Sequence, residues 1–295
     1  MPVGIATISL TLIYTPPMRR LIINADDLGI NAPRSHGIFT CMEEGFVRST
    51  TLIANMQDSL NAARRIKERG FSAGLHINLS EGSALTPERD VHSLLDIRGY
   101  FLGRTKLWEL LDAGEIESEH IEREIRAQIE WFFDNAGTPT HVDSHHHIHI
   151  HPQIVPLLGA ILSRYGISVI RVPMESTERL GWEISPERLA FIKLINEYAL
   201  RAKPIFENAD LRSTDYFRGM ALVGEANARR LRNLLTSLPE GTTELMVHPG
   251  QRAPEGADPF SSDPQRETER EMLMDEDMPA YLASQKIERI SYADL

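Results

Sequence analysis

One stretch of the chain, residues 143–151, reads Asp143-Ser144-His145-His146-His147-Ile148-His149-Ile150-His151. Five of the eleven histidines of the protein lie in it. The alternation of imidazole with isoleucine is typical of a β-strand, in which successive side chains point to opposite faces. Imidazole is the commonest metal ligand among protein side chains, so we expect this strand to carry part of a catalytic metal site. Its polar face would consist of Asp143, His145, His147, His149 and His151.

The apolar patterns of the remaining chain alternate between short runs and longer amphipathic stretches. Apolar and β-branched runs of strand length lie at residues 21–25, 49–55, 71–79, 167–172, 242–247 and 287–290. Stretches with helical patterns lie at residues 31–44, 59–69, 106–113, 118–135, 153–165, 175–204, 226–237 and 266–274. Such alternation favours a parallel sheet covered by helices. About seven units predict an α/β fold, a (β/α) TIM-like barrel, incomplete or distorted, in a single domain. An open doubly wound sheet is the alternative.

The net charge and the cysteine count limit which partners and which cellular compartment suit the protein. The net charge of −11 argues against nucleic acid as a partner, because phosphate backbones need a positive surface. The single cysteine, Cys41, excludes an intrachain disulfide and suits a reducing compartment, so we expect a cytoplasmic protein. No apolar run reaches the roughly 18 residues of a transmembrane segment. A homodimer is compatible with the sequence.

The first residues are predicted to be separate from the barrel. Residues 1–17 are apolar and contain no Lys or Arg, so they lack the positive start of a secretory signal. Pro16 and Pro17 then separate them from the first predicted strand. We expect residues 1–17 to be a poorly ordered extension and residues 18–295 to form the barrel domain.

Polar residues lie at the ends of several predicted strands. Asp26 and Asp27 follow the first strand, His76 lies near the end of the third, and His248 follows residues 242–247. Because the carboxyl ends of parallel strands form one edge, these residues and the histidine stretch are expected to meet in one site. One carboxylate and two imidazoles, with positions left for water, make a workable hydrolytic metal site. Adjacent aspartates cannot both point the same way from a strand, so one can bind the metal while the other stays free as a general base.

Four segments resemble the motifs of YdjC-like carbohydrate deacetylases, a family that includes chitooligosaccharide deacetylases. They are residues 24–29 (NADDLG), 74–76 (GLH), 140–149 (THVDSHHHIH) and 244–250 (ELMVHPG). The resemblance implies a (β/α) barrel-like fold, a divalent metal ion, and removal of an N-acetyl group from an amino sugar. One branch of the family is associated with hopanoid lipids, so a lipid-linked amino sugar is an alternative to an oligosaccharide. The family often has Phe where this chain has Leu28.

The family motifs also imply roles for individual residues. Asp27, His76 and His145 would bind the metal, with Asp26 as the general base and His248 as the general acid. Two imidazoles and a carboxylate suit Zn²⁺ by ligand softness, whereas members of the family are described with Mg²⁺, so the metal stays open.

Other polar residues are assigned supporting roles from the residues alone. Asp143 would orient an imidazole through a carboxylate–histidine hydrogen bond. His147 and His149 are candidates for support of the ligands or for contact with substrate. Arg171 would contact substrate or acetate, or be a buried ion-pair partner. The remaining histidines read as ordinary surface or packing residues: His36, His92, His120 and His141.

Two other functions are compatible with the same residues. A phosphoesterase would use a similar barrel, but it would usually need two metals, and no phosphate-binding Gly/Lys motif is present. A non-catalytic metal-binding protein would use the histidine stretch alone and would not need Asp26, Asp27 or His248. The sequence favours hydrolysis of an N-acetylated sugar over both.

Overall fold

The computed structural model describes residues 19–253 and 258–295. A sheet of seven strands forms its centre, in the order β4-β3-β2-β1-β6-β5, with β7 also paired to β1. Every strand pair is parallel. The strands are β1 (Arg19–Leu28), β2 (Ser49–Leu52), β3 (Ser72–Ile77), β4 (Val142–Ser144), β5 (Tyr216–Arg218), β6 (Gly241–Val247) and β7 (Ile287–Ile290). The predicted extension, residues 1–17, lies outside the described residues.

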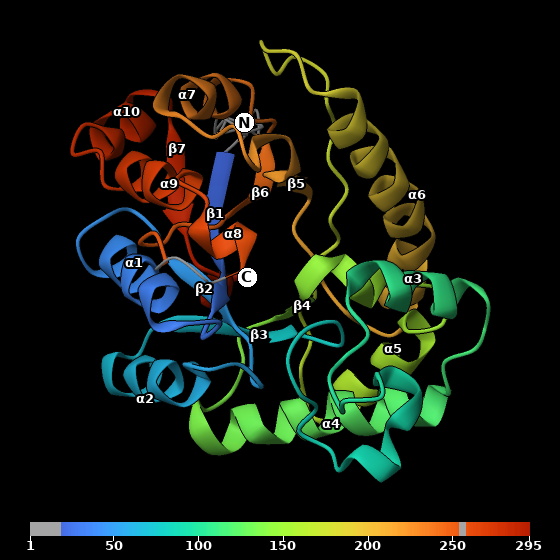
Figure 1. The fold of residues 1–295 in the computed structure, drawn as a ribbon. Coiled ribbons are helices and arrows are strands. Elements are labelled where there is room, and N and C mark those ends of the chain that lie inside the picture. Colours follow the sequence, from blue (N-terminus) through green and yellow to red (C-terminus); the bar gives the residue numbers. More distant parts are fainter. Residues whose placement is uncertain (1–18, 254–257) are drawn as a thin grey trace, which may run out of the picture.

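Helices surround the sheet on its outer side (Figure 1). They are α1 (Ala32–Glu43), α2 (Ser59–Arg69), α3 (Arg104–Asp112), α4 (Ser118–Asn135), α5 (Val155–Arg164), α6 (Pro186–Asn208), α7 (Ala228–Thr236), α8 (Pro259–Ser262), α9 (Gln265–Leu273) and α10 (Met278–Ser284). Several bounds agree with the predicted ones to the residue, including those of α2, α4 and β7. None of the described helices is long and apolar enough to span a membrane.

The sheet curls into a barrel that is not regular all the way round. Between β4 and β5, the described residues pair through the isolated parallel bridges Val142–Ile170, Val169–Arg212 and Glu175–Phe217 rather than through a regular strand. The predicted strand at residues 167–172 is therefore wrong as a regular strand. Pro173, which has no N–H group, interrupts the pairing before it resumes at Glu175. The prediction of an incomplete or distorted (β/α) barrel is confirmed.

The first strand, β1, is the centre of the sheet because it pairs with three strands, β2, β6 and β7. Leu21, Ile22 and Ile23 are 0–1% exposed. Leu21 and Ile23 belong to the main core with the helices, whereas Ile22 points into a small cluster with Val169 and Tyr292. Burial of each such side chain stabilises the fold by about 1.5–3 kcal/mol. A strand buried on both faces explains the continuous apolar run that leads to the two aspartates.

The prediction of one strand across residues 143–151 is wrong beyond Ser144. β4 ends there, and η3 (His145–Ile150) follows as tight 3₁₀ turns. His146 and His147 have φ angles of 56° and 57°, in the left-handed region that non-glycine residues seldom adopt. The strict alternation of faces is lost at these two residues, so the five polar side chains do not share one face.

The predicted helix at residues 175–204 begins later than expected. α6 starts at Pro186, and the Ser185 hydroxyl accepts a hydrogen bond from the Arg188 amide at 3.2 Å. Ser before Pro is a strong signal for a helix start, because it caps a free amide while Pro needs no partner. Residues 175–184 instead form irregular chain, with one isolated bridge at Glu175.

Candidate active site

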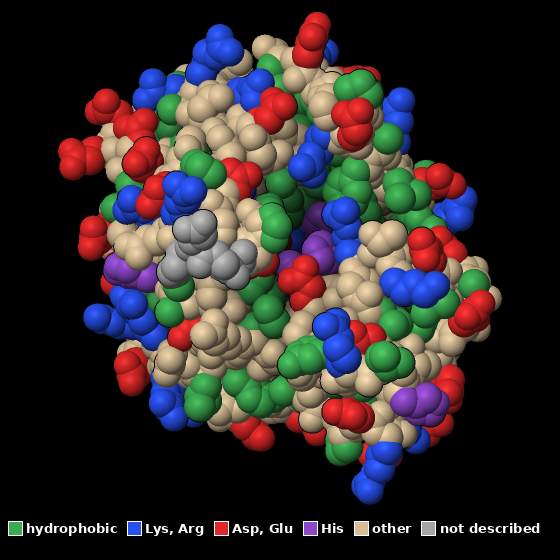
Figure 2. All heavy atoms as spheres, in the orientation of Figure 1, with side chains coloured by type: hydrophobic (Ala, Val, Ile, Leu, Met, Phe, Trp, Pro, Cys, Tyr) green, Lys and Arg blue, Asp and Glu red, His purple; other side chains and the backbone are tan. Residues whose placement is uncertain are grey.

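A cavity of about 340 Å³ opens at the carboxyl ends of the strands. Figure 2 shows histidine side chains deep in this hollow, with basic and acidic side chains around it. The candidate residues that line it come from β1, β3, the turn after β4 and the end of β6. They are Asp26, Asp27, His76, His145, His147 and His248.

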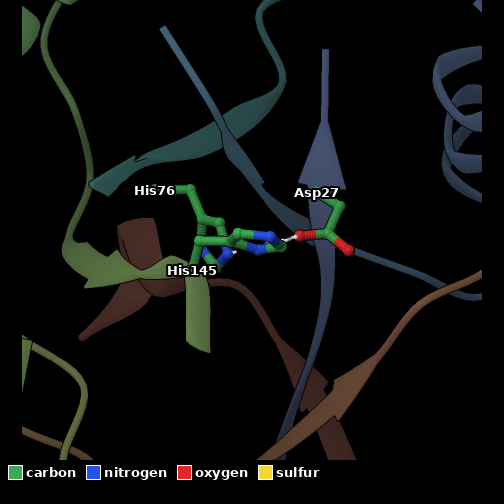
Figure 3. A group of neighbouring side chains, drawn as sticks. All are labelled: Asp27, His76 and His145. Carbon is green, nitrogen blue, oxygen red and sulfur yellow. Dashed lines mark ion pairs between the residues drawn. The ribbon is translucent and has the colours of Figure 1, made fainter. Parts of the chain in front are cut away.

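Three side chains point toward one another in the cavity, as Figure 3 shows. Asp27 Oδ1 lies 2.9 Å from His145 Nδ1 and 3.4 Å from His76 Nε2. Ligands about 2.0–2.2 Å from a tetrahedral ion lie roughly 3.4 Å apart, so these separations fit one divalent metal. The set combines one carboxylate with two imidazoles, the donor chemistry of hydrolytic zinc sites. Asp27, His76 and His145 can therefore hold one metal ion.

The ring of His76 is held in place from behind. Its Nδ1 lies 2.7 Å from Asp143 Oδ1, which leaves Nε2 facing Asp27. Such a carboxylate fixes the tautomer and orientation of a ligating imidazole. Gly74 allows the neighbouring packing, because a Cβ there would lie 2.5 Å from the His141 ring. The predicted orienting role of Asp143 has the geometry it requires.

The backbone of Asp27 explains how two adjacent aspartates reach one cavity. Its φ angle is 69°, and the pairing of β1 with β2 shifts register between Ala25 and Leu28. The bulge turns Asp27 to the same side as Asp26, so both line the cavity. The expectation that adjacent aspartates must point apart is therefore wrong here, because it assumed a regular strand.

Asp26 is bound to a buried arginine rather than free. Arg171 Nη1 and Nη2 lie 2.6 and 2.8 Å from its two carboxylate oxygens. Burial is the largest single influence and opposes ionisation of Asp26, but the charge and hydrogen bonds of Arg171, together with His76 and His248, lower its pKa well below the usual range. The same arginine pairs with Asp143 at 2.8 Å and with Glu244 at 2.5 Å. Arg171 therefore joins the candidate base to the carboxylate that orients His76.

Replacement of this arginine should test its structural role. Arg171 is completely buried, and Arg171→Met would leave three buried carboxylates without their counter-ion. We expect a loss of about 3–5 kcal/mol in the free energy of unfolding, measured by urea denaturation. Arg212→Met is the matched control, since this arginine is exposed and its side chain donates to the Leu295 carbonyl rather than to a buried carboxylate. Equal stability of the two variants would contradict the role given to Arg171.

His248 lies on the opposite side of the cavity from the histidine stretch, at the end of β6. Its backbone is fixed by Glu269, which accepts from the His248 amide at 2.5 Å, and by Arg266, which donates to the His248 carbonyl at 2.9 Å. Its Nδ1 is buried without a hydrogen-bond partner. Burial lowers the pKa of His248 to about 4, although Asp27 and Asp26 favour its charged form. The ring is thus available to exchange a proton with a molecule in the cavity.

The pKa values of the two ligand histidines are raised, whereas that of His248 is lowered. Burial alone would lower the pKa of each ring. Asp143, with Asp27 and Asp26, instead raises the pKa of His76 to about 10, and Asp27, with Glu81, raises that of His145 to about 9. Without a metal ion, these rings hold protons that balance the buried carboxylates. A divalent cation would replace those protons, because ligating imidazoles must be neutral.

Comparison with known proteins identifies the family. A model of the family described as "YdjC-like protein" matches residues 20–284. The chain belongs to the YdjC-like family. A "Carbohydrate deacetylase" of Mus musculus is 33% identical over 95% of this chain and 96% of its own. A "Chitooligosaccharide deacetylase" of Yersinia enterocolitica is 35% identical over 57% of this chain and 65% of its own. The resemblance that the four motifs indicated is confirmed.

A solved structure also has the fold of this YdjC-like chain. It is described as a putative cellobiose-phosphate cleavage protein from Enterococcus faecalis. It covers 94% of this chain and 98% of its own, with a TM-score of 0.72 and 23% sequence identity. The likeness supports the distorted barrel.

Two further predicted residues of the YdjC-like site lie in different surroundings. His147 lines the cavity and lies beside Phe217 and Phe191, with ring centroids 6.0 and 6.5 Å away. His149 is completely buried, and its ring bonds the Ser144 hydroxyl and the Arg171 carbonyl at 2.6 and 2.9 Å. His149 therefore supports Arg171 from outside the cavity.

Several residues near the site were not predicted. Arg34 pairs with the second oxygen of Asp27 at 3.0 Å, and Glu81 lies 3.5 Å from His145. Glu244 lay within a recognised motif, and a carboxylate inside a buried strand was a signal that it has a buried cation as partner. No comparable signal marked Glu81, which lies in the polar loop after β3.

Proposed function

We propose that this protein is a metal-dependent hydrolase that removes an N-acetyl group from an amino-sugar-containing carbohydrate. One observation carries the proposal: a carboxylate and two imidazoles spaced for one metal share a cavity with a second carboxylate, Asp26, and a separate imidazole, His248. Amide hydrolysis needs such parts, namely a Lewis acid, a base and an acid for the leaving amine. The names of the relatives support the same chemistry.

Asp27, His76 and His145 would hold the metal, and we favour Zn²⁺ over Mg²⁺. Imidazole is a poor ligand for Mg²⁺, which prefers oxygen donors and keeps several waters. A divalent ion held there supplies Lewis acidity to the acetamide carbonyl and to a neighbouring water. Asp143 keeps the His76 ring in the ligating tautomer. Arg34 binds Asp27 Oδ2, which leaves Asp27 Oδ1 to face the two histidines.

The other residues of the cavity would move the protons. Asp26 would accept the proton of the attacking water, with Arg171 holding the carboxylate in position. Because burial lowers the pKa of His248 to about 4, the ring would first have to take up a proton, which Asp26 obtains from the attacking water. His248 would then deliver that proton to the departing amine as the carbon–nitrogen bond breaks. Phe191 and Met220 line the same cavity and offer apolar surface to a sugar ring. Acetate and a free amino sugar would be the products.

Product analysis tests the proposal most directly. We expect the zinc-loaded protein to release acetate from members of a panel of N-acetylated oligosaccharides and glycolipids, detected by mass spectrometry. Removal of the metal with a chelator should abolish the release, and addition of Zn²⁺ should restore it. Release of phosphate from phosphorylated sugars without release of acetate would favour a phosphoesterase. Bound metal without either product would favour a non-catalytic metal-binding protein.

A further inference from the structure

A second group of side chains that could hold a metal lies away from the cavity, where the polar insertion between β3 and α3 meets the start of α4. Glu117 precedes α4, and two histidines face its carboxylate. His92 Nε2 lies 3.3 Å from Glu117 Oε1, and His120 Nε2 lies 3.4 Å from Glu117 Oε2. The two rings meet edge to face with centroids 4.5 Å apart. All three donor groups are close enough for one ion.

The other nitrogen of each ring faces a polar group. His92 Nδ1 lies 3.4 Å from the Arg89 carbonyl oxygen. His120 Nδ1 lies 2.8 Å from the Ser93 hydroxyl and accepts from the Ser93 amide at 3.3 Å. A metal-binding imidazole usually donates its second N–H to an oxygen, which leaves the first nitrogen as a ligand. The Arg89 carbonyl has this role at His92, and the Ser93 hydroxyl would take it at His120 once Nδ1 carries the proton. The Ser93 hydroxyl also accepts from the Glu117 amide at 3.1 Å. One serine therefore orients two of the three donors.

An ion pair alone explains this arrangement less well. His92 and Glu117 are 66% and 55% exposed, and exposed pairs of this kind stabilise a fold by little. Two protonated imidazoles beside one carboxylate would repel each other. Neutral rings could donate Nε2–H to Glu117, but separations of 3.3 and 3.4 Å are long for such hydrogen bonds and match those of two ligands of one ion. One cation between neutral rings satisfies all three groups without that repulsion.

We propose that His92, Glu117 and His120 form a second metal site that takes Zn²⁺ or a similar borderline-soft divalent ion. Two imidazoles and a carboxylate suit such ions, and solvent would supply the remaining position. The site joins η2 (His92–Leu94) of the insertion to the start of α4.

The proposed ion would have a structural effect that reaches the cavity. The insertion is already attached to α4 by Glu124, whose carboxylate accepts from the Leu85 and Thr86 amides at 3.1 and 2.9 Å. The ion would add a second attachment at His92, in the middle of the same loop. Glu81, at the start of the insertion, lines the cavity. The second site thus stabilises the loop that carries Glu81 without taking part in the reaction.

Zinc stoichiometry separates the two sites. Equilibrium dialysis with Zn²⁺ alone should give about two ions per chain for the wild type and about one for His92→Gln. Because His92 is exposed, His92→Gln should fold normally and release acetate at a rate within about twofold of the wild type. The matched control is His36→Gln, an exposed histidine outside both sites, and it should keep both ions.

The same measurement on the Asp27→Ala variant makes the test independent of the proposed function. Asp27→Ala should keep about one ion, and Asp27→Ala/His92→Gln should keep none. The visible spectrum of Co²⁺ bound to Asp27→Ala should also disappear on addition of His92→Gln. Equal zinc content of His92→Gln and the wild type would overturn the second site. Loss of one ion from a protein that never releases acetate would support the second site and refute the deacetylase.

Discussion

Asp27→Ala should lose both the metal ion of the cavity and all measurable release of acetate. Asp27 Oδ1 is the one atom that faces both ligand histidines, at 2.9 Å from His145 and 3.4 Å from His76. Without Asp27, the site keeps two imidazoles but has lost the carboxylate that balances the charge of the ion. A structural readout is needed because Arg34 would also lose its partner inside the protein.

The variants for this experiment can be matched closely. Asp27→Asn keeps the shape of the side chain and a hydrogen-bonding oxygen for Arg34, so it should fold. It should bind the metal poorly, because the amide has no negative charge. Asp263→Ala removes another carboxylate that lines the cavity and should keep metal and activity. Metal content by mass spectrometry and acetate release are measured on each, with thermal unfolding as a check of the fold. Full occupancy of the cavity site in Asp27→Asn would contradict the Asp27–His76–His145 site.

The cavity also offers a second set of possible ligands, Glu81, His145 and His146, which would explain metal binding without Asp27. Glu81 lies 3.5 Å from His145 Nε2 and 3.8 Å from His146 Nε2. These three groups are also close enough for one ion. Loss of metal in Glu81→Gln, together with its retention in Asp27→Asn, would move the site to this alternative set.

The sequence predicted the elements whose patterns are local. Gly70 ends α2 in the left-handed conformation, and α4 has one apolar stripe of Ile121, Ile125, Ile129 and Phe132. The structure has the predicted bounds for both helices. The meeting of Asp27, His76 and His145 followed from topology, since the carboxyl ends of parallel strands share one edge. Neither inference required knowledge of any distant contact.

The errors have a common physical cause, which is backbone conformation that side-chain patterns do not encode. The histidine stretch has the alternation of a strand, but His146 and His147 adopt left-handed angles. The same holds at Asp27, whose φ of 69° turns it beside Asp26. Such conformations are held by surrounding contacts and tend to occur at functional sites, so a local pattern predicts a regular strand where the chain turns.

Ion pairs between residues far apart in the chain also could not be predicted from the sequence. Arg171 was predicted as a substrate contact or as a buried ion-pair partner, and only the fold places Asp26, Asp143 and Glu244 around it. His92 and His120 likewise read as ordinary residues, because Glu117 and Ser93 relate them through the packing of a loop against α4. Long-range partners of this kind leave no periodicity in the sequence.

Asp26→Asn should keep the metal of the cavity and lose turnover. The Asp26 carboxylate does not belong to the set of donors around Asp27, so its charge is not needed to hold the ion. Arg171 would still have Asp143 and Glu244 as partners, and the fold should tolerate the neutral amide. An amide cannot accept a proton from water, and loss of a general base typically lowers kcat by about 10²–10⁴-fold.

The pairing with Arg171 decides how large this loss should be and which control is needed. Arg171 lowers the pKa of Asp26, and a weak base accepts a proton less effectively, so we expect the lower end of that range, about 10²-fold. Glu244→Gln is the matched control, because Glu244 binds the same arginine but does not line the cavity. A similar loss in both variants would show that Asp26 acts by positioning Arg171. Full activity of Asp26→Asn would exclude Asp26 as the base, because no proton acceptor would remain at that position.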